Sequence, residues 1–333
     1  MTSPQRVWLL LGPRRGDNTQ VLALGEALGM PFETRTMSYN WFARLRMRWF
    51  STDVGHLTRA AGRWLQPPWP DAVVGIGRRT VPVARWIQQQ SGGRTSLVRL
   101  GHPRAPNEWF DLVITTRQYP VPPGDNVVTL PLAMNRFRKA PEATAAERAW
   151  LDALPRPHLL LSLGGPSAMW RLDNAALRLA ATKLLRRVEA DGGTLIAVGS
   201  PRTPADAWAV VRSTLGTSPS AAIAGADAVR YPVLLADADE HFVTADSISM
   251  ISEAVMTGKP VGLIPAEPDA RGRRRIAGRP PEATSFRDPR RFWADMQARG
   301  LVGTVDAPKA GTFDDPVQTA VTAMKRELGR LFE

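Results

Sequence analysis

The sequence predicts an α/β protein of two domains, each built on a parallel β-sheet. Its 333 residues exceed what a single hydrophobic core usually organises. Short β-prone apolar runs alternate with segments of helical periodicity, and this rhythm favours parallel sheets covered by helices on both faces. Residues 131–157, which hold four prolines and no strand-like run, interrupt the rhythm before it starts again. We therefore expect domains at residues 1–150 and 151–315, and a helical segment, 316–333, that packs back on the first domain.

In the first domain, apolar runs predict strands and periodic segments predict two helices. The expected strands are residues 7–11, 32–37, 71–76, 96–100, 112–115 and 127–130, and the expected helices are residues 19–28 and 81–90. Ligands of such sheets bind beyond the carboxyl ends of the strands. The ligand-facing loops are therefore expected at residues 12–18, 77–80 and 101–106.

The second domain repeats the pattern. The expected strands are residues 158–163, 194–198, 242–244 and 261–264, and the expected helices are residues 174–190, 204–215, a segment after residue 246, and 316–331. Residues 267–285 contain turn formers and arginines without periodicity, which predicts a long loop. Its arginines are Arg271, Arg273, Arg274, Arg275 and Arg279. Such a loop either closes over a bound diphosphate or stays solvated.

The stretch HFVTADSISMISEAVMTGKPVGLIP, residues 241–265, carries the strongest indication of chemistry. It predicts a β-α-β unit whose helix is capped by Asp246 or Ser247 and stopped by a left-handed glycine, Gly258. Ser249 and Glu253 lie four residues apart, and therefore on one helix face. A hydroxyl at a helix N-terminus suits a phosphate, and a carboxylate one turn later suits a ribose diol. The alternative is a well-capped helix with solvated polar side chains.

Three other motifs are each compatible with a site or with ordinary structure. The run GGPS, residues 164–167, directly follows a predicted strand and is either a phosphate-approach loop or a glycine-rich turn. The run GIGRRT, residues 75–80, is half a dinucleotide fingerprint with arginine where glycine is needed, so no nicotinamide cofactor is predicted. The run DAD, residues 237–239, resembles a metal-holding carboxylate pair, but helix-end solvation explains it better. The four histidines are scattered, and no metal site is predicted.

The net charge of +12 lies almost entirely in the first half of the chain. Residues 1–150 hold 20 Lys and Arg against 10 Asp and Glu, whereas residues 151–333 hold 23 against 21. Such a basic half suits nucleic acid, anionic lipid or an anionic substrate. There is no cysteine, no apolar run of about 20 residues and no signal-peptide pattern, so we expect a cytoplasmic protein.

The stretch from Trp41 to Phe50, WFARLRMRWF, predicts a helix whose apolar face is edged by arginines. This pattern is typical of a helix that lies in a membrane interface, and it predicts a peripheral position on anionic lipid at the inner face of the membrane. The alternative is a helix docked on the sheet with arginine stems as its lid. No nucleic-acid-binding module is recognised, and nucleic acid is not expected as a partner.

Several stretches together resemble one family. They are VWLLLGPRRGDNTQ with LGEALG, DAVVGIGRRTVPVARWI, LLLSLGGPS and, above all, FVTADSISMISEAVMTGKPV. The sequence is similar to bacterial relatives of the plant mitochondrial-fission factor named for elongated mitochondria, over about residues 7–305. That resemblance implies two Rossmann-like domains facing across a cleft. This is the GT-B architecture of the peptidoglycan N-acetylglucosaminyl transferase and of UDP-N-acetylglucosamine 2-epimerase.

The resemblance also implies a nucleotide-sugar site, mostly on the second domain. The residues it implicates in nucleotide binding are Gly164, Gly165, Ser247, Ser249, Met250 and Glu253. Ser167, Ser200 and Arg202, in the loops that follow two predicted strands of the same domain, are further candidates for nucleotide binding. Glu253 takes the ribose, and the N-terminus of its helix takes the diphosphate. The glycine-rich loop that ends in histidine in the sugar transferase is GPRRGDN here, so the base is unassigned, with Asp17 and His102 as candidates.

The expected activity is metal-independent glycosyl transfer from a nucleotide sugar such as a UDP-sugar, without a further cofactor. The alternatives are a UDP-sugar epimerase and a non-catalytic recruitment protein at the membrane surface, since the plant relative recruits partners.

Overall fold

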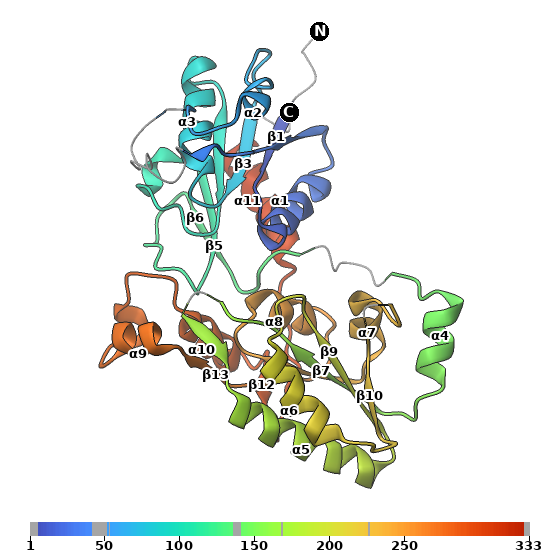
Figure 1. The fold of residues 1–333 in the computed structure, drawn as a ribbon. Helices are drawn as coiled ribbons and strands as arrows, with labels where there is room; N and C mark the ends of the chain where they lie inside the picture. Colours follow the sequence, from blue (N-terminus) through green and yellow to red (C-terminus); the bar gives the residue numbers. More distant parts are fainter. Residues whose placement is uncertain are drawn as a thin grey trace. The chain divides into compact units, whose positions relative to one another are not determined.

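The computed structural model describes residues 6–41, 52, 54–135, 141–167, 169–225 and 227–329. The chain forms two compact units. The first, the N-terminal unit, comprises Met1–Arg136 and Asp314–Glu333, and the second, the C-terminal unit, comprises Phe137–Phe313. The boundary thus lies at residue 136 rather than at the expected residue 150 (Figure 1). Helix α4 (Ala145–Asp152) belongs to the C-terminal unit, because its Glu147 is bound by Arg230 of that unit at 2.7 Å.

The N-terminal unit is built on a six-stranded sheet in the order β2-β1-β3-β4-β5-β6, and every neighbouring pair is parallel. The strands are β1 (Val7–Leu11), β2 (Phe32–Thr36), β3 (Ala72–Ile76), β4 (Ser96–Leu100), β5 (Leu112–Thr116) and β6 (Val127–Leu130). All six lie where their apolar runs predict them. Strands β3, β4 and β5 are buried along their whole length, as expected of a sheet covered on both faces.

Helices cover both faces of this sheet. One face packs against α1 (Arg15–Ala27) and α11 (Pro316–Glu327), the helix predicted to return to this unit. The other face packs against α3 (Thr80–Gln90) and the short α2 (Arg59–Gly62). Alternate residues of each strand serve the two layers, because successive side chains of a strand point to opposite faces.

Helix α1 begins four residues before the predicted start at residue 19. The side chain of Asn18 causes part of this difference, because it folds back on the end of β1. It accepts from Gly12 N–H at 2.9 Å and donates to Gly12 O at 2.9 Å. This bridge closes the connection into a tight turn, and the residues predicted as loop become the first helical turn.

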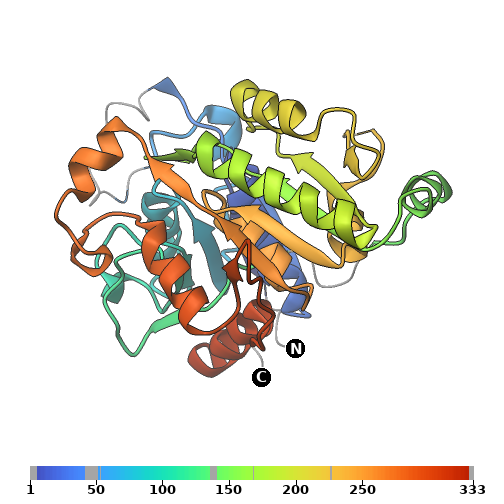
Figure 2. The same ribbon diagram turned by 90° about the horizontal axis from the view of Figure 1, so that it is seen from below.

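The C-terminal unit has a second parallel six-stranded sheet, in the order β10-β9-β7-β11-β12-β14. Its strands are β7 (His158–Leu163), β9 (Thr194–Gly199), β10 (Ala221–Ile223), β11 (Glu240–Thr244), β12 (Val261–Ile264) and β14 (Gly303–Thr304). Helices α5 (Asn174–Asp191) and α6 (Ala205–Leu215) lie side by side along one face (Figures 1 and 2). Helices α7 (Tyr231–Asp237) and α8 (Ile248–Val255) pack against the sheet as well.

The prediction of a long loop at residues 267–285 is wrong. This segment contains β13 (Ala266–Pro268), which pairs with β8 (Trp170–Leu172), and then α9 (Ala270–Ile276), before α10 (Pro289–Ala298). Helix α9 is capped by Asp269, whose carboxylate accepts from Gly272 N–H at 2.6 Å. A run of arginines hides this helix from periodicity, because it offers no apolar stripe.

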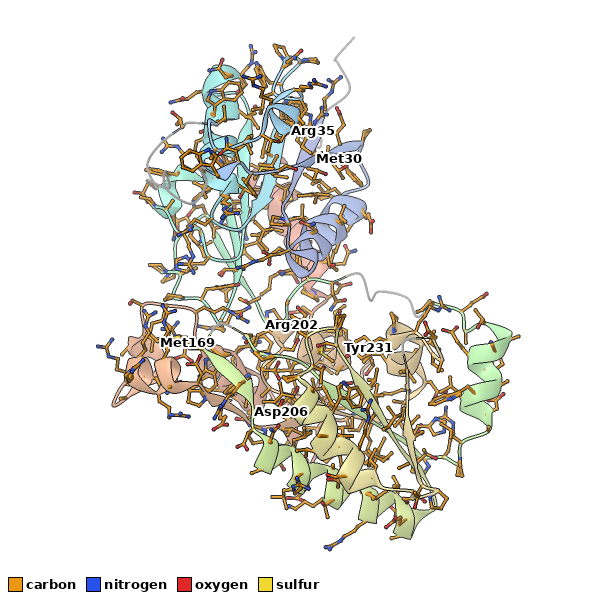
Figure 3. The ribbon with its side chains drawn as sticks, viewed as in Figure 1. Met30, Arg35, Met169, Arg202, Asp206 and Tyr231 are labelled. Carbon is orange, nitrogen blue, oxygen red and sulfur yellow. The ribbon has the colours of Figure 1, made fainter. Side chains whose placement is uncertain are left out.

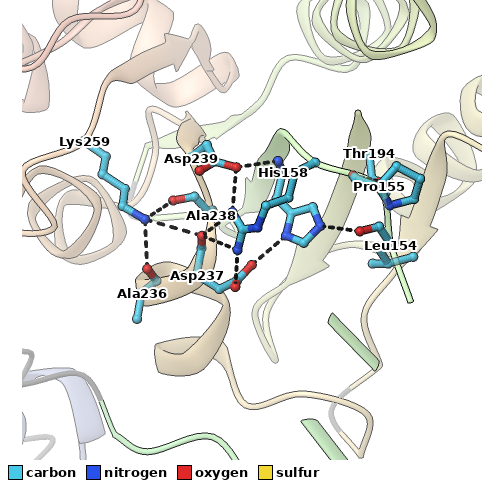
Figure 4. A network of polar contacts seen from close by, with 10 residues as sticks. Leu154, Pro155, His158, Thr194, Ala236, Asp237, Ala238, Asp239 and Lys259 are labelled. Atoms are coloured by element: carbon cyan, nitrogen blue, oxygen red, sulfur yellow. Dashed lines mark hydrogen bonds and ion pairs between the residues drawn. The ribbon is translucent and has the colours of Figure 1, made fainter. Parts of the chain in front are cut away.

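A polar network closes the amino edge of the C-terminal sheet (Figure 4). Asp237, the last residue of α7, pairs with His158 Nδ1 at 2.6 Å and with Arg156 at 2.5 Å. Asp239 accepts from His158 N–H at 2.8 Å and from Arg156 at 2.7 Å. The DAD run is therefore helix-end structure, and no metal-binding cluster occurs in the described part of the chain. Lys259 donates to carbonyls at the end of α7, with Ala236 O at 2.9 Å.

The packing of α11 predicts which unit a core substitution weakens. Met324 is fully buried against the N-terminal sheet, so Met324→Ala should lower the stability of that unit by about 2–5 kcal/mol. Hydrogen exchange followed by mass spectrometry should show faster exchange in β1, β3 and α1, with the strands of the C-terminal unit unchanged. The neighbouring exposed Lys325→Ala is the control and should leave both units unchanged. Equally faster hydrogen exchange in both sheets would contradict the division of the chain into these two units.

Candidate functional site

The candidate site lies at the carboxyl edge of the C-terminal sheet, where the strand order reverses between β7 and β11. Ligands of open α/β sheets bind at such a switch point. Three connections meet there: residues 164–167 after β7, residues 200–203 after β9, and residues 245–247 after β11. Hydrogen bonds join them, and these bonds fix the edge as one structure.

The glycine pair after β7 is held directly by the segment after β11. Gly164 N–H donates to Thr244 Oγ1 at 2.8 Å, and Gly165 N–H donates to Asp246 Oδ2 at 2.7 Å. A Cβ on Gly164 would collide with the Asp246 carboxylate, and one on Gly165 would collide with the backbone of Arg202. The glycines are thus required by this packing, and their two N–H groups are already used inside the unit.

Asp246 is a buried carboxyl group, 1% exposed. Neither it nor Ser247 caps α8 with its side chain, which corrects the sequence prediction, because the Asp246 carboxylate turns to Gly165 instead. Burial raises the pKa of Asp246, although hydrogen bonds from Thr244 and Gly165 oppose the shift. Its Oδ1 is buried and has no hydrogen-bond partner among the described residues.

Helix α8 therefore begins without a side-chain cap. Its first turn contains Ser249 and Met250, and the N–H groups of a first turn have no partner within their helix. Ser249 is exposed, whereas the rest of residues 241–250 is buried or half-buried. The structure thus presents an accessible helix N-terminus at the switch point, where an anion is favoured by free donors and by the helix dipole.

Glu253 lies one turn further along α8 and is half-buried. Burial raises the pKa of Glu253 to about 7, and no cation of the described residues offsets that shift. Close enough to Glu253 to act on it electrostatically is a buried residue that sequence analysis missed, Tyr231 at the start of α7 (labelled in Figure 3). Its hydroxyl oxygen and that of Ser162 on β7 are both buried without a hydrogen-bond partner among the described residues. Burial raises the pKa of Tyr231, and the neighbouring Glu253 carboxylate adds to that shift. The polar residue in the otherwise apolar strand HLLLSL was the one available signal.

The other predicted residues of this unit brace the edge. Ser200 Oγ donates to Gly164 O at 3.0 Å, and Ser167 Oγ donates to the Asp246 carbonyl at 3.0 Å. Arg202 is exposed and holds Pro166 O with Nη1 at 3.2 Å (Figure 3). Trp293 of α10, another residue that sequence analysis missed, donates to Ala245 O at 2.8 Å. The structure therefore brings all nine predicted nucleotide-site residues to one edge and its helix.

The two candidate bases belong to the N-terminal unit. His102 follows β4, and burial, followed by the charges of Arg104 and Arg99, lowers its pKa to about 4. The ring is therefore neutral at pH 7, and a base is most effective when its pKa lies near the working pH. Asp17 lies in the first turn of α1, and its carboxylate approaches Gly77 at the end of β3.

The predicted membrane helix lies outside the described residues, apart from its first residue. Trp41 has 63% of its surface exposed, and residues 42–51 are not described. In the part of the chain that is described, no helix combines the length and the apolar character that crossing a bilayer requires.

Comparisons with known sequences identify one family. The profile of the family described as Mitochondrial fission ELM1 matches residues 15–279. The Mitochondrial fission protein ELM1 of Arabidopsis thaliana is 32% identical over 241 residues, which are 65% of this chain and 56% of that protein. The chain thus spans little more than half the length of this relative. A Rickettsia prowazekii protein, RP120, is 22% identical over 291 residues, which are 77% of this chain and 82% of its own.

Solved structures share the fold of the whole chain. MnaA of S. aureus, in a structure with UDP, aligns over 99% of this chain and 98% of its own, with a TM-score of 0.55 and 11% identity. The UDP-GlcNAc 2-epimerase of Methanocaldococcus jannaschii aligns over 99% and 100%, with a TM-score of 0.55 and 11% identity. Os79 of O. sativa, in complex with UDP, aligns over 98% and 94%, with a TM-score of 0.52 and 14% identity. At these identities the likeness establishes a GT-B-like fold.

The raised pKa of Glu253 predicts a pH-dependent stability. The folded state resists ionising this carboxyl group, so the fold is penalised as pH rises from about 4.5, the ordinary value, to about 7. Glu253→Gln removes the penalty. Its melting temperature should equal that of the unmodified protein near pH 4.5 and exceed it above pH 7. The corresponding gain in stability is roughly 3.5 kcal/mol, at about 1.4 kcal/mol per pKa unit over the shift from about 4.5 to about 7. Glu267→Gln is the control. Equal plots of melting temperature against pH for Glu253→Gln and the unmodified protein would contradict the burial of the Glu253 carboxyl group.

Proposed function

The chain belongs to the mitochondrial fission ELM1 family, and on that basis we propose that its C-terminal unit binds a nucleoside-diphosphate sugar. The supporting observation is the uncapped N-terminus of α8 at the switch point between β7 and β11. A UDP-sugar is the proposed ligand, because proteins of the same fold have been crystallised with UDP.

The diphosphate would lie against the first turn of α8. Ser249 and Met250 offer N–H groups there, and the Ser249 hydroxyl is exposed to the ligand. Arg202 is an exposed cation of this edge, and its guanidinium could pair with a phosphate oxygen after leaving Pro166 O. The Gly164 and Gly165 N–H groups would act indirectly, because they hold the β11–α8 segment in place.

Glu253 would accept the ribose hydroxyls, one turn beyond the diphosphate. A carboxylate accepts both hydroxyls, whereas a protonated carboxyl group is the poorer acceptor. Because burial raises the pKa of Glu253 to about 7, nucleoside binding would draw a proton off this group at neutral pH. The buried Tyr231 hydroxyl, which has no hydrogen-bond partner among the described residues, would be available to this carboxyl group.

The reaction we propose is glycosyl transfer without a metal ion. The α8 N-terminus and Arg202 would stabilise the departing diphosphate, as preorganised donors do for developing charge. Asp17 is the proposed base, because the depressed pKa of His102 leaves that imidazole a weak proton acceptor at pH 7. Epimerisation of a UDP-sugar is the alternative reaction at the same site.

A second candidate function is attachment to an anionic membrane surface without turnover. It is supported by Trp41, the most exposed large apolar side chain of the described residues, at the start of the arginine-edged stretch. Tryptophan and arginine together suit the boundary between lipid headgroups and acyl chains.

The nucleotide proposal predicts that two substitutions at one exposed position, Ser249, differ in their effect on UDP affinity. Ser249→Asp places a negative charge at the N-terminus of α8, which favours the helix but repels a diphosphate. UDP affinity, measured by calorimetry, should fall roughly ten- to hundredfold, by Coulomb repulsion at short range in a protein environment. Ser249→Asn, neutral and of similar size, should retain most of the affinity. Equal UDP binding by both variants would remove the α8 N-terminus from the site.

The membrane candidate predicts salt-sensitive binding to vesicles. Changing Arg44, Arg46 and Arg48 to Glu should abolish co-sedimentation with phosphatidylserine vesicles, since each arginine near the surface contributes about 1 kcal/mol. Changing three exposed arginines of the C-terminal unit to Glu alters the net charge equally and should change sedimentation little. These control residues are Arg271, Arg274 and Arg279. Loss of vesicle binding in both triple variants would mean that the net charge of the protein explains the binding, and that the 41–50 stretch does not act as the membrane contact.

A further inference from the structure

The N-terminal unit contains a buried arginine whose charge is not matched by an acid. Arg99 lies on β4, close to its carboxyl end, and is 1% exposed. Its Nη1 donates to Thr80 Oγ1 at 2.6 Å, and its Nη2 donates to His102 O at 3.2 Å. Its Nε is buried without a hydrogen-bond partner, and no carboxylate of the described residues lies within ion-pair distance. Both acceptors are neutral, so the positive charge forms no ion pair among the described residues.

Burying such a charge is costly, and at two other buried positions the chain avoids this cost by forming an ion pair. Burial is the main cause that lowers the pKa of Arg99 to about 10, which records the penalty on its charged form. By contrast, the buried carboxylates Asp288 and Glu147 are each paired with an arginine at 2.7 Å. An arginine that served packing alone would be expected to have a similar partner, because an unpaired buried charge destabilises the fold.

Further arginines surround this group at the same edge of the sheet. Arg104, in the connection after β4, is exposed and close enough to lower the pKa of Arg99 and of His102. The guanidinium of Arg79 lies 4.7 Å from the centre of the Tyr39 ring, at the N-terminus of α3. Repulsion from Arg104 and Arg79 also contributes to the lowered pKa of Arg78. Asp17 is the one acid of the described residues whose charge opposes this shift and raises the pKa of Arg99.

The backbone keeps these cations together in spite of their repulsion. Arg104 has φ of 56°, and it is the one residue other than glycine in the described ranges with a positive φ. Its N–H donates to His102 Nδ1 at 3.1 Å, which holds the connection in this conformation. Helix α3 has eleven residues, and its N-cap residue, Arg79, makes no side-chain cap, so the first N–H groups of the helix add to the positive potential.

We infer that the N-terminal unit binds a phosphate-bearing ligand at this arginine cluster, defined as Arg79, Arg99 and Arg104 with the N-terminus of α3. Forked guanidinium groups bind phosphate oxygens in pairs, and several of them suit a group of two or more negative charges better than a single carboxylate. The ligand supplies the counter-charge that Arg99 lacks. The cluster belongs to the N-terminal unit, and the inference does not depend on the nucleotide proposal.

Titration with inorganic pyrophosphate tests this inference. Calorimetry is done on the full chain carrying Ser249→Asp, which suppresses diphosphate binding at α8, so that the remaining binding reports the arginine cluster. Adding Arg104→Gly should weaken pyrophosphate binding about ten- to hundredfold, the scale of a charge-assisted hydrogen bond. Glycine suits the positive φ at this position, so the fold should be kept or stabilised. The control, Arg94→Gly, removes the same charge at the amino edge of the sheet and should leave binding unchanged.

Arg99→Met provides an independent readout. It should weaken pyrophosphate binding to a similar extent while the melting temperature stays level or rises, because an unmatched buried charge is replaced by an apolar chain of similar length. A fall in melting temperature with unchanged pyrophosphate binding would assign Arg99 to the scaffold and overturn the inference.

Two other outcomes also overturn it. Equal binding by the Arg104→Gly and Arg94→Gly proteins would mean that the cluster does not hold the anion. Competition between UDP and pyrophosphate in the Ser249→Asp protein would make the cluster part of a nucleotide site rather than a site for a second ligand. Failure of the unmodified chain to bind UDP would reject the nucleotide proposal alone, since the pyrophosphate titration does not involve it.

Discussion

The bonds between the turn after β7 and the segment after β11 determine the form of the C-terminal edge. Thr244 and Asp246 accept from two consecutive glycine N–H groups, and in doing so Asp246 leaves the cap of α8 vacant. One carboxylate thus joins two loops and exposes a helix N-terminus at the same time. A conventional cap at Asp246 would have stabilised the helix and closed the position where an anion can bind.

The two units bury ionisable groups of opposite charge. In the C-terminal unit the incompletely compensated groups are carboxyls, Asp246 and Glu253, whose pKa values are raised by burial. In the N-terminal unit the corresponding group is a guanidinium, Arg99, whose pKa is lowered by burial. Buried charge of this kind lowers stability and is retained at positions where a ligand or reaction uses it. Both groups lie at the carboxyl edge of a parallel sheet, where the fold places its ligands.

The sequence was sufficient for the parts of the fold that depend on local apolar patterns. The strands of the N-terminal sheet, the β-α-β unit around Glu253 and the long helices follow from alternation and periodicity. The arginine-rich α9 could not be predicted in this way, because its helix is fixed by the Asp269 cap and by β13 pairing with β8. The candidate nucleotide residues were found mainly through the family resemblance. Arg99 was missed, since a single arginine within an apolar strand gives no indication of whether an acid lies opposite.

Helix α11 makes the N-terminal unit discontinuous, with the whole C-terminal unit inserted between its two parts. During synthesis, residues 6–135 leave the ribosome without the apolar side chains that cover one face of their sheet, which include Val317, Val321 and Met324. The C-terminal unit can complete its core first, and the N-terminal unit closes only afterwards. A chain shortened before residue 314 would expose that apolar face, so translation stalled late in the chain would yield an aggregation-prone product even though both sheets were already made.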